Sequence, residues 1–311
     1  MSGAHLDNPP SFLVLPSIMK PAPFEYFAPD SIDEALELLT RHGDDAKILA
    51  GGQSLMPLMN LRLARPKVIV DINRLPELDF ISARSDGVLT IGCLVRQRAI
   101  ERSVVVKEQN PLLAATVPMI GHFQIRNRGT IGGSIAHADP AAELPAVTLL
   151  LDAQLWLRSA SGIRTVPAAE FYLGYMTTAM EPAELLTEIH FPRWRRGDGW
   201  AIEEISRRKG DFAMVGVAAR VQMDEAEIVE DVAIAMFGIG GKPERMAKAE
   251  KLLKGHRVHQ RLLLELAKTV ADDLNPDTDL HASAQYRKEV GGVLARRALE
   301  SALIRAKGTT N

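Results

Sequence analysis

The chain has 311 residues, a formal net charge of −2 and a hydrophobic fraction of 46%. This length suits two or three domains, and the composition is ordinary for a globular protein. The near-neutral charge supplies no basic field for nucleic acid, and no apolar run reaches the roughly 18 residues that a membrane span needs.

The N-terminal residues and the cysteine count indicate the cellular location and exclude some kinds of site. Residues 1–16 lack the basic start and the roughly 7–15 consecutive apolar residues of a secretory signal. We therefore predict a flexible N-terminal tail and a cytoplasmic protein. The single cysteine, Cys93, excludes an internal disulfide and the four-cysteine ligation of a usual iron–sulfur cluster. Its apolar neighbours Ile91 and Leu94 predict a buried, inert thiol.

Residues 17–75 are predicted to form a small α/β unit. Ser31 and Glu34 have capping-box spacing, apolar residues then follow on one helical face, and Gly43 is a suitable C-terminal stop. Strands are predicted at "AKILAGG", which runs into a first glycine loop, and at "KVIVDI", residues 67–72. Pro57 disfavours a helix directly after those glycines.

Residues 76–197 form a second, mixed unit in this interpretation. A strand is predicted at 87–95, and a helix at 110–120 with Pro111 in its first turn. A second glycine loop follows. Residues 145–159 begin helical or extended and end in an alternating strand, and another strand is predicted at 184–192.

The run "RWRRGDG", residues 193–199, is rich in charge and glycine and predicts a domain boundary. Beyond it come three strand candidates and then three helix candidates, at 243–254, 258–273 and 283–306. Strands followed by helices predict a C-terminal α+β domain, residues 198–311, with helices on one face of an antiparallel sheet. The whole chain is therefore expected to be α+β.

Two glycine loops lie about eighty residues apart, in "ILAGGQSLMPLMNLRLARP" and "IRNRGTIGGSIAHADPAAELP". Successive free N–H groups at such loops can hold an anion such as phosphate. Two loops of similar composition favour a ligand with two phosphates, and a dinucleotide has that shape. The nicotinamide pattern G-x-G-x-x-G does not fit the first loop. A third glycine cluster, at 238–241, is interpreted as a turn that ends a strand.

These segments carry a family resemblance. They are similar to the two flavin-binding segments of the FAD-containing medium subunit of molybdenum hydroxylases, the xanthine dehydrogenase and carbon monoxide dehydrogenase group. "RRKGDFAMVGVAARV" resembles the start of that family's C-terminal domain, and the likeness runs from about Met19 to residue 305. It implies a two-part FAD-binding domain of the vanillyl-alcohol-oxidase (PCMH) type, in subdomains 17–75 and 76–197, followed by the smaller C-terminal domain.

The resemblance also implies FAD-binding roles for particular positions. They are Leu49, Ala50, Gly51, Gly52, Gln53, Ser54 and Leu55 in the first segment, Thr130, Ile131, Gly132, Gly133 and Ser134 in the second, and the separate positions Glu143 and Leu186. The sequence departs from the family where Ser134 stands in place of a common Asn. It departs again at Glu203 and Glu204, near which the family often has an FAD-contacting Lys; Lys209 is a candidate replacement.

The two loops contain no Lys or Arg within their five-residue glycine cores, "AGGQS" and "TIGGS". Backbone N–H groups would therefore hold most of the diphosphate, assisted by the hydroxyls of Ser54 and Thr130. Each hydrogen bond to a charged group contributes roughly 1.5–3 kcal/mol, so several would hold FAD without a covalent bond.

Other polar residues near the second loop have simpler interpretations. His122 and His137 lack a third ligand at metal-binding spacing, and His137 is either near the flavin edge or a polar loop residue. Asp139 suggests loop ligation or capping. Arg126 and Arg128 are expected at the surface or at a subunit contact. Tyr172 and Tyr175 either pack in the core or shield a flavin. We assign no catalytic acid or base and no metal ligand.

The resemblance implies a subunit rather than a complete enzyme. Its partners would be a small [2Fe–2S] subunit and a large subunit with the molybdopterin cofactor, in a dimer of heterotrimers. This chain would pass electrons from the clusters to NAD, a quinone or oxygen. Two alternatives stay open: a self-sufficient flavin oxidoreductase acting on a small molecule, and a non-catalytic assembly module. The substrate of the complex is not specified by this chain.

Overall fold

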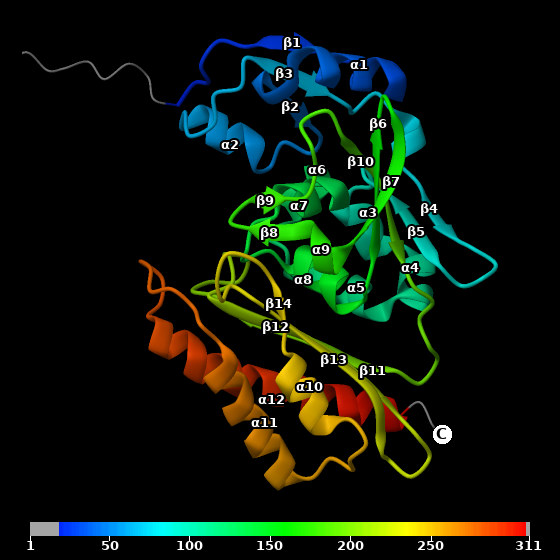
Figure 1. Cartoon of the computed structure of the whole chain (residues 1–311), viewed down its shortest axis with the longest axis vertical. Helices are drawn as coiled ribbons and strands as arrows, with labels where there is room; N and C mark the ends of the chain where they lie inside the picture. Colours follow the sequence, from blue (N-terminus) through cyan, green and yellow to red (C-terminus); the bar gives the residue numbers. More distant parts are fainter. Residues whose placement is uncertain (1–18, 309–311) are drawn as a thin grey trace, which may run out of the picture.

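The computed structural model describes residues 19–308, and the predicted tail, residues 1–16, lies outside that range. Among the described residues, the three larger sheets follow one another along the chain and are stacked from one end of the molecule to the other, and a two-stranded sheet accompanies them (Figure 1). No helix within residues 19–308 is long and apolar enough to cross a membrane. The architecture is α+β, as predicted.

The first sheet is parallel and has the strand order β1-β3-β2. Its strands are β1 (Glu25–Phe27), β2 (Ala46–Leu49) and β3 (Val68–Asp71), and α1 (Ile32–His42) connects β1 to β2. Ser31 Oγ accepts a hydrogen bond from the Glu34 backbone N–H, and Gly43 ends the helix with a φ of +49°. The predicted cap and stop of this helix are confirmed, whereas β1 was not predicted.

A short helix, α2 (Leu55–Asn60), begins three residues after Gly52, with Ser54 at its N-cap position. The sequence-based expectation that Pro57 disfavours a helix here is wrong. Pro57 is the third residue of α2, where its missing N–H would in any case have no partner within the helix. Met56 N–H donates to Gly52 O over 3.2 Å and joins the loop to the helix.

The second sheet is antiparallel, with the order β4-β5-β10-β6-β7. Its strands are β4 (Ile81–Ala83), β5 (Leu89–Gly92), β6 (Gln154–Ser159), β7 (Gly162–Pro167) and β10 (Leu185–Phe191). Between β5 and β6 come α3 (Gln97–Arg102), α4 (Val104–Gln109), α5 (Pro111–Thr116), α6 (Phe123–Arg128), α7 (Ile131–His137) and α8 (Glu143–Leu150). After β7, α9 (Ala168–Phe171) leads into the hairpin of β8 (Tyr172–Gly174) and β9 (Thr177–Thr178).

The second glycine segment is a helix N-terminus rather than a loop. Thr130 caps α7, because its Oγ1 accepts a hydrogen bond from Gly133 N–H over 3.0 Å. A Cβ on Gly132 would lie only 2.4 Å from Cys93 Cβ, so the helix packs closely against the chain after β5. Glycine has a low helix propensity, and this close packing outweighs it.

The C-terminal sheet is antiparallel, with the order β11-β12-β13-β14. Its strands are β11 (Gly199–Ile205), β12 (Val215–Met223), β13 (Val229–Phe237) and β14 (Glu244–Arg245). The helices α10 (Ala247–Leu253), α11 (Gln260–Asp273) and α12 (Ala284–Gly308) cover one face of this sheet (Figure 1). The predicted order of strands and helices is therefore confirmed, while the boundaries at residues 75 and 197 stay predictions.

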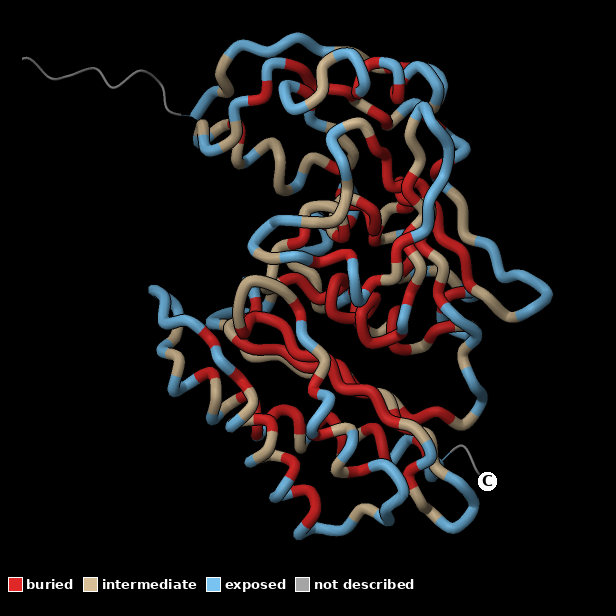
Figure 2. The backbone as a smooth tube through the Cα atoms, viewed as in Figure 1, coloured by how far each residue is buried: buried red, intermediate tan, exposed pale blue. Residues whose placement is uncertain are grey.

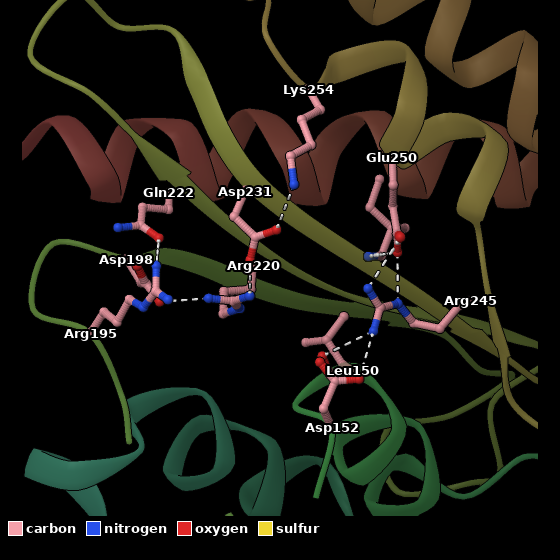
Figure 3. A network of polar contacts seen from close by, with 11 residues as sticks. Leu150, Asp152, Arg195, Asp198, Arg220, Gln222, Asp231, Arg245, Glu250 and Lys254 are labelled. Carbon is pink, nitrogen blue, oxygen red and sulfur yellow. Dashed lines mark hydrogen bonds and ion pairs between the residues drawn. The ribbon is translucent and has the colours of Figure 1, made fainter. Parts of the chain in front are cut away.

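The other face of the C-terminal sheet contacts α8, and all eight residues of α8 are buried. Ala146 of α8 packs with Ala213 and Phe237. Buried residues lie both in α8 and in the strands of the C-terminal sheet (Figure 2). Polar contacts close the edge of the junction: Arg245 binds Glu250 through Nε over 2.7 Å and reaches Asp152 over 3.3 Å (Figure 3). The first residue of α8, Glu143, is consequently buried beside the C-terminal sheet.

Candidate cofactor site

The two glycine segments, far apart in sequence, lie in direct backbone contact. A Cβ placed on Gly51 would lie 2.5 Å from Arg128 O and 2.8 Å from Gly129 Cα. A Cβ on Gly133 would lie 4.0 Å from the Cβ of Ala50. Only a glycine at position 51 permits this approach, because a side chain would have to displace backbone. The structure thus brings together the two segments that the sequence suggested.

The first segment presents a run of unused N–H donors. Within residues 19–308, the backbone N–H groups of Gly51, Gly52, Gln53, Ser54 and Leu55 donate no hydrogen bond. The Ser54 hydroxyl also has no partner there, and Gly52 has a φ of +72°. Consecutive amides left free at a turn form the kind of concavity that binds anions. The expectation of free amides is met in this segment.

The second segment offers fewer free donors than expected. Gly132 N–H donates to Cys93 O over 3.0 Å, and Gly133 N–H donates to Thr130 Oγ1. The Thr130 N–H, in contrast, has no acceptor among the described residues, although Thr130 is only 2% exposed. A buried N–H without a partner is rare in proteins and indicates a place for a ligand or water. Among the described residues of this segment, only the Thr130 amide therefore stays free of a hydrogen bond.

A buried and a half-buried carboxyl group, those of Glu143 and Glu204, lie where α8 meets the C-terminal sheet. Glu143 begins α8 and is 8% exposed. Burial, with the neighbouring charge of Glu204 as the second cause, raises the pKa of Glu143 to about 8. Burial raises the pKa of Glu204 to about 7, and its Oε2 has no hydrogen-bond partner in the described chain. Glu143 therefore holds its proton at neutral pH and can donate a hydrogen bond.

Strand alternation explains why the neighbouring acids Glu203 and Glu204 differ. Ile202, two residues before Glu204, packs against Ala146 and Phe237 on the α8 side of the sheet. Glu203 points the other way. Burial raises the pKa of its carboxyl, and this effect outweighs the charge of Arg297 and a hydrogen bond with Ser301, which both lower it.

Lys209 lies exposed between β11 and β12.

The remaining candidates are distributed over three elements. Leu186 is buried on β10, which contacts α7. Tyr172 is buried and its hydroxyl lies 2.7 Å from Thr148 Oγ1, so it is a core residue. Tyr175 is 59% exposed, and its hydroxyl donates to Asp277. His137 is a half-buried residue in the last turn of α7.

Arg126 is a correction to the sequence analysis, which expected it at the surface or at a subunit contact. It is 8% exposed. Its Nε donates to Glu101 Oε2 over 3.0 Å, and its Nη1 donates to the carbonyls of Ile120 and Gly121. It therefore has a structural role between α3 and α6. Arg128, in contrast, is exposed as expected.

Cys93 is buried, and burial raises the pKa of its thiol. The prediction of a buried thiol is confirmed. The raised pKa keeps the thiol protonated, and a protonated thiol is a poor nucleophile.

Comparison with known proteins identifies the family to which this chain belongs. Residues 22–194 match the family model described as the FAD binding domain in molybdopterin dehydrogenase. Residues 200–302 match the CO dehydrogenase flavoprotein C-terminal domain. The chain belongs to the FAD-binding medium subunits of the molybdenum hydroxylases. A free run of amides beside a buried free N–H fits the diphosphate of FAD.

Relatives of this family are similar over nearly their whole length. The chain is 42% identical over 291 residues to the 6-hydroxypseudooxynicotine dehydrogenase complex subunit alpha of Paenarthrobacter nicotinovorans, covering 94% of this chain and 98% of that subunit. A solved carbon monoxide dehydrogenase structure from Hydrogenophaga pseudoflava matches with a TM-score of 0.90 at 38% identity, covering 92% and 99% of the two chains. Quinoline 2-oxidoreductase from Pseudomonas putida 86 matches with a TM-score of 0.88 at 33% identity, covering 94% and 100%.

Proposed function

We propose that this medium subunit passes electrons from the [2Fe–2S] clusters of a small partner subunit to an external acceptor. The substrate would be oxidised on a large subunit that carries the molybdopterin cofactor, and the acceptor would be NAD, a quinone or oxygen. FAD, when bound, supplies the redox chemistry that links the clusters to the acceptor. The cytoplasmic location also stays a prediction.

The run of five free amides next to the buried Thr130 N–H carries this proposal. We propose that the diphosphate of FAD binds there, through residues 49–55 and through Thr130, Ile131, Gly132, Gly133 and Ser134, with further contacts from Glu143 and Leu186. This chain would bind and orient the cofactor and exclude water. At neutral pH Glu143 would offer a proton-bearing carboxyl rather than a negative charge.

The alternative of a self-sufficient flavin oxidoreductase loses two of its three candidate bases. It would need a base beside the flavin, and the sequence offered His137, Tyr172 and Tyr175. Tyr172 is buried against Thr148, and burial raises the pKa of its hydroxyl. The hydrogen bond to Asp277 raises the pKa of Tyr175. Neither phenol is therefore suited to accept a proton at neutral pH.

The subunit proposal predicts what purifies with the chain. Isolated from its native source under mild conditions, it is expected in a dimer of heterotrimers with iron and molybdenum, and with one non-covalent FAD per medium subunit. Native mass spectrometry and metal analysis measure this. A chain that purifies alone with its flavin, and that oxidises a small molecule without any partner, would instead establish the self-sufficient alternative.

A further inference from the structure

A chain of side-chain hydrogen bonds runs between the two glycine segments. Arg96 donates to Arg128 O through Nη1 over 2.6 Å, and to Asn73 Oδ1 through Nη2 over 2.5 Å. Asn73 Nδ2 in turn donates to Ala50 O over 2.8 Å. Asn73 and Arg96 therefore connect the carbonyl that precedes Gly51 with the carbonyl of Arg128, which is the atom that a side chain on Gly51 would meet.

The surroundings of Asn73 allow only one orientation of its amide. Its Oδ1 accepts from the guanidinium of Arg96, which has donors only. Its Nδ2 therefore faces two acceptors, Ala50 O and Asp71 Oδ1, the second at 2.5 Å. Burial pushes the pKa of Asp71 up, but hydrogen bonds from Tyr26 and Asn73 outweigh it and lower the pKa. Asp71 thus stays an acceptor and keeps the amide in place.

This orientation determines where the free amides point. In a trans peptide the C=O and the following N–H point in opposite directions. Because Asn73 holds the Ala50 C=O on its own side, the Gly51 N–H is directed to the other side. Gly51 is the first of the five residues whose N–H groups have no partner in the described chain. Asn73 and Arg96 therefore fix the direction of the first free N–H, that of Gly51.

The charge of Arg96 favours the same ligand. The side chain is half-buried, and burial, followed by the charge of Arg128, lowers the pKa of its guanidinium, which nevertheless stays protonated. Among the described residues Arg96 forms no ion pair, because its acceptors are a carbonyl and an amide oxygen. Its hydrogen-bond partners are neutral, although the charges of Asp79 and Asp71 also act on its guanidinium. A partly buried cation that is joined through Asn73 to the Ala50 carbonyl favours an anion bound at the amides that follow.

We propose that Asn73 and Arg96 are positioning residues that hold the first glycine segment in the conformation that binds the FAD diphosphate. This inference rests on the proposed function. A cavity of about 290 Å³ lies beside the pair and is lined in part by Asn73, Arg74, Asp79, Leu94 and Arg96. Shortening either side chain therefore enlarges an existing cavity instead of opening a closed core, and the variants should fold.

The test measures the affinity of the full-length, FAD-free chain for FAD by flavin fluorescence. Asn73→Ala and Arg96→Met are each expected to weaken binding about tenfold to a hundredfold, the range of one or two lost hydrogen bonds to a charged group. The double variant should bind no more weakly than the weaker single variant, because both changes break one connected chain. Arg96→Lys keeps the charge but not the forked guanidinium that reaches both acceptors, and should recover part of the affinity.

The matched control is Arg102→Met, an exposed arginine at the end of α3, which should bind FAD like the wild type. Thermal unfolding of the FAD-free variants separates a positioning role from a folding defect. Wild-type affinity in folded Asn73→Ala and Arg96→Met would overturn the inference while leaving the proposed function intact, and so would strictly additive losses. If one variant fails to fold, the other and Arg96→Lys decide the question. A wild-type chain that binds no FAD would overturn both proposals.

Discussion

Replacing Gly51 with valine is expected to lower the affinity for FAD by at least about a hundredfold. A Cβ at this position would lie 2.5 Å from Arg128 O and 2.8 Å from Gly129 Cα. Both neighbours are backbone atoms, so the two glycine segments must move apart and the free amides lose their arrangement. The visible absorption of bound flavin after purification and titration with added FAD measures the effect. Overpacking of this kind costs about 1–3 kcal/mol of stability, so the fold should persist.

The control for this variant is Gly240→Val, in the third glycine cluster. A Cβ on Gly240 meets no atom within 4 Å, so the substitution should leave the flavin content unchanged. Normal flavin content in Gly51→Val would contradict the assignment of the first segment. Gly132→Val is a poorer test than the sequence suggested, because its Cβ would lie 2.4 Å from Cys93 Cβ in the buried core. We expect that variant to lose stability as well as flavin.

The stability of the FAD-free chain is expected to fall as pH rises from about 5 to 8, in part because of Glu143. The pKa of Glu143 is raised from 4.5 to about 8 in the folded chain. Across this interval the unfolded chain has released a proton that the folded chain still binds, so the free energy of unfolding decreases with pH. At about 1.4 kcal/mol per unit of pKa difference, the loss is on the order of 3–5 kcal/mol.

Urea unfolding of the FAD-free chain at several pH values measures this slope. Glu143→Gln keeps the shape of the side chain but cannot ionise, so its midpoint should depend much less on pH than that of the wild type. Glu230→Gln, an exposed acid on β13, is the matched control and should follow the wild type. A slope in Glu143→Gln equal to that of the wild type would show that Glu143 is ionised in the folded protein.

Local sequence signals predicted many of the elements correctly. The Ser31 cap, the Gly43 stop and Pro111 in a first turn act within one element, so no tertiary information is needed to interpret them. The order of strands and helices after residue 198 also follows from local pattern alone. The α7 helix could not be predicted in this way, because two glycines are unfavourable in a helix and only packing against Cys93 compensates for them.

The candidate site was predicted less completely than the fold. Both glycine segments are visible in the sequence, but which of their amides stay free depends on partners such as Cys93 O, far away in the chain. Asn73 and Arg96 were missed because neither lies in a glycine motif. One signal was available for Asn73. Asn73 lies just after β3, and Ala50 lies just after β2. These two strands are adjacent and parallel, so their C-terminal ends meet at one edge of the sheet.

Hydrogen–deuterium exchange of the wild-type chain with and without FAD tests the central claim most directly. FAD is expected to slow exchange of the free amides at residues 51–55 and of the Thr130 amide, because these N–H groups gain acceptors only when the diphosphate is bound. Exchange at residues 238–241, the third glycine cluster, should not change. Unaltered exchange at 51–55 in a chain that demonstrably holds FAD, or protection confined to 238–241, would contradict the account.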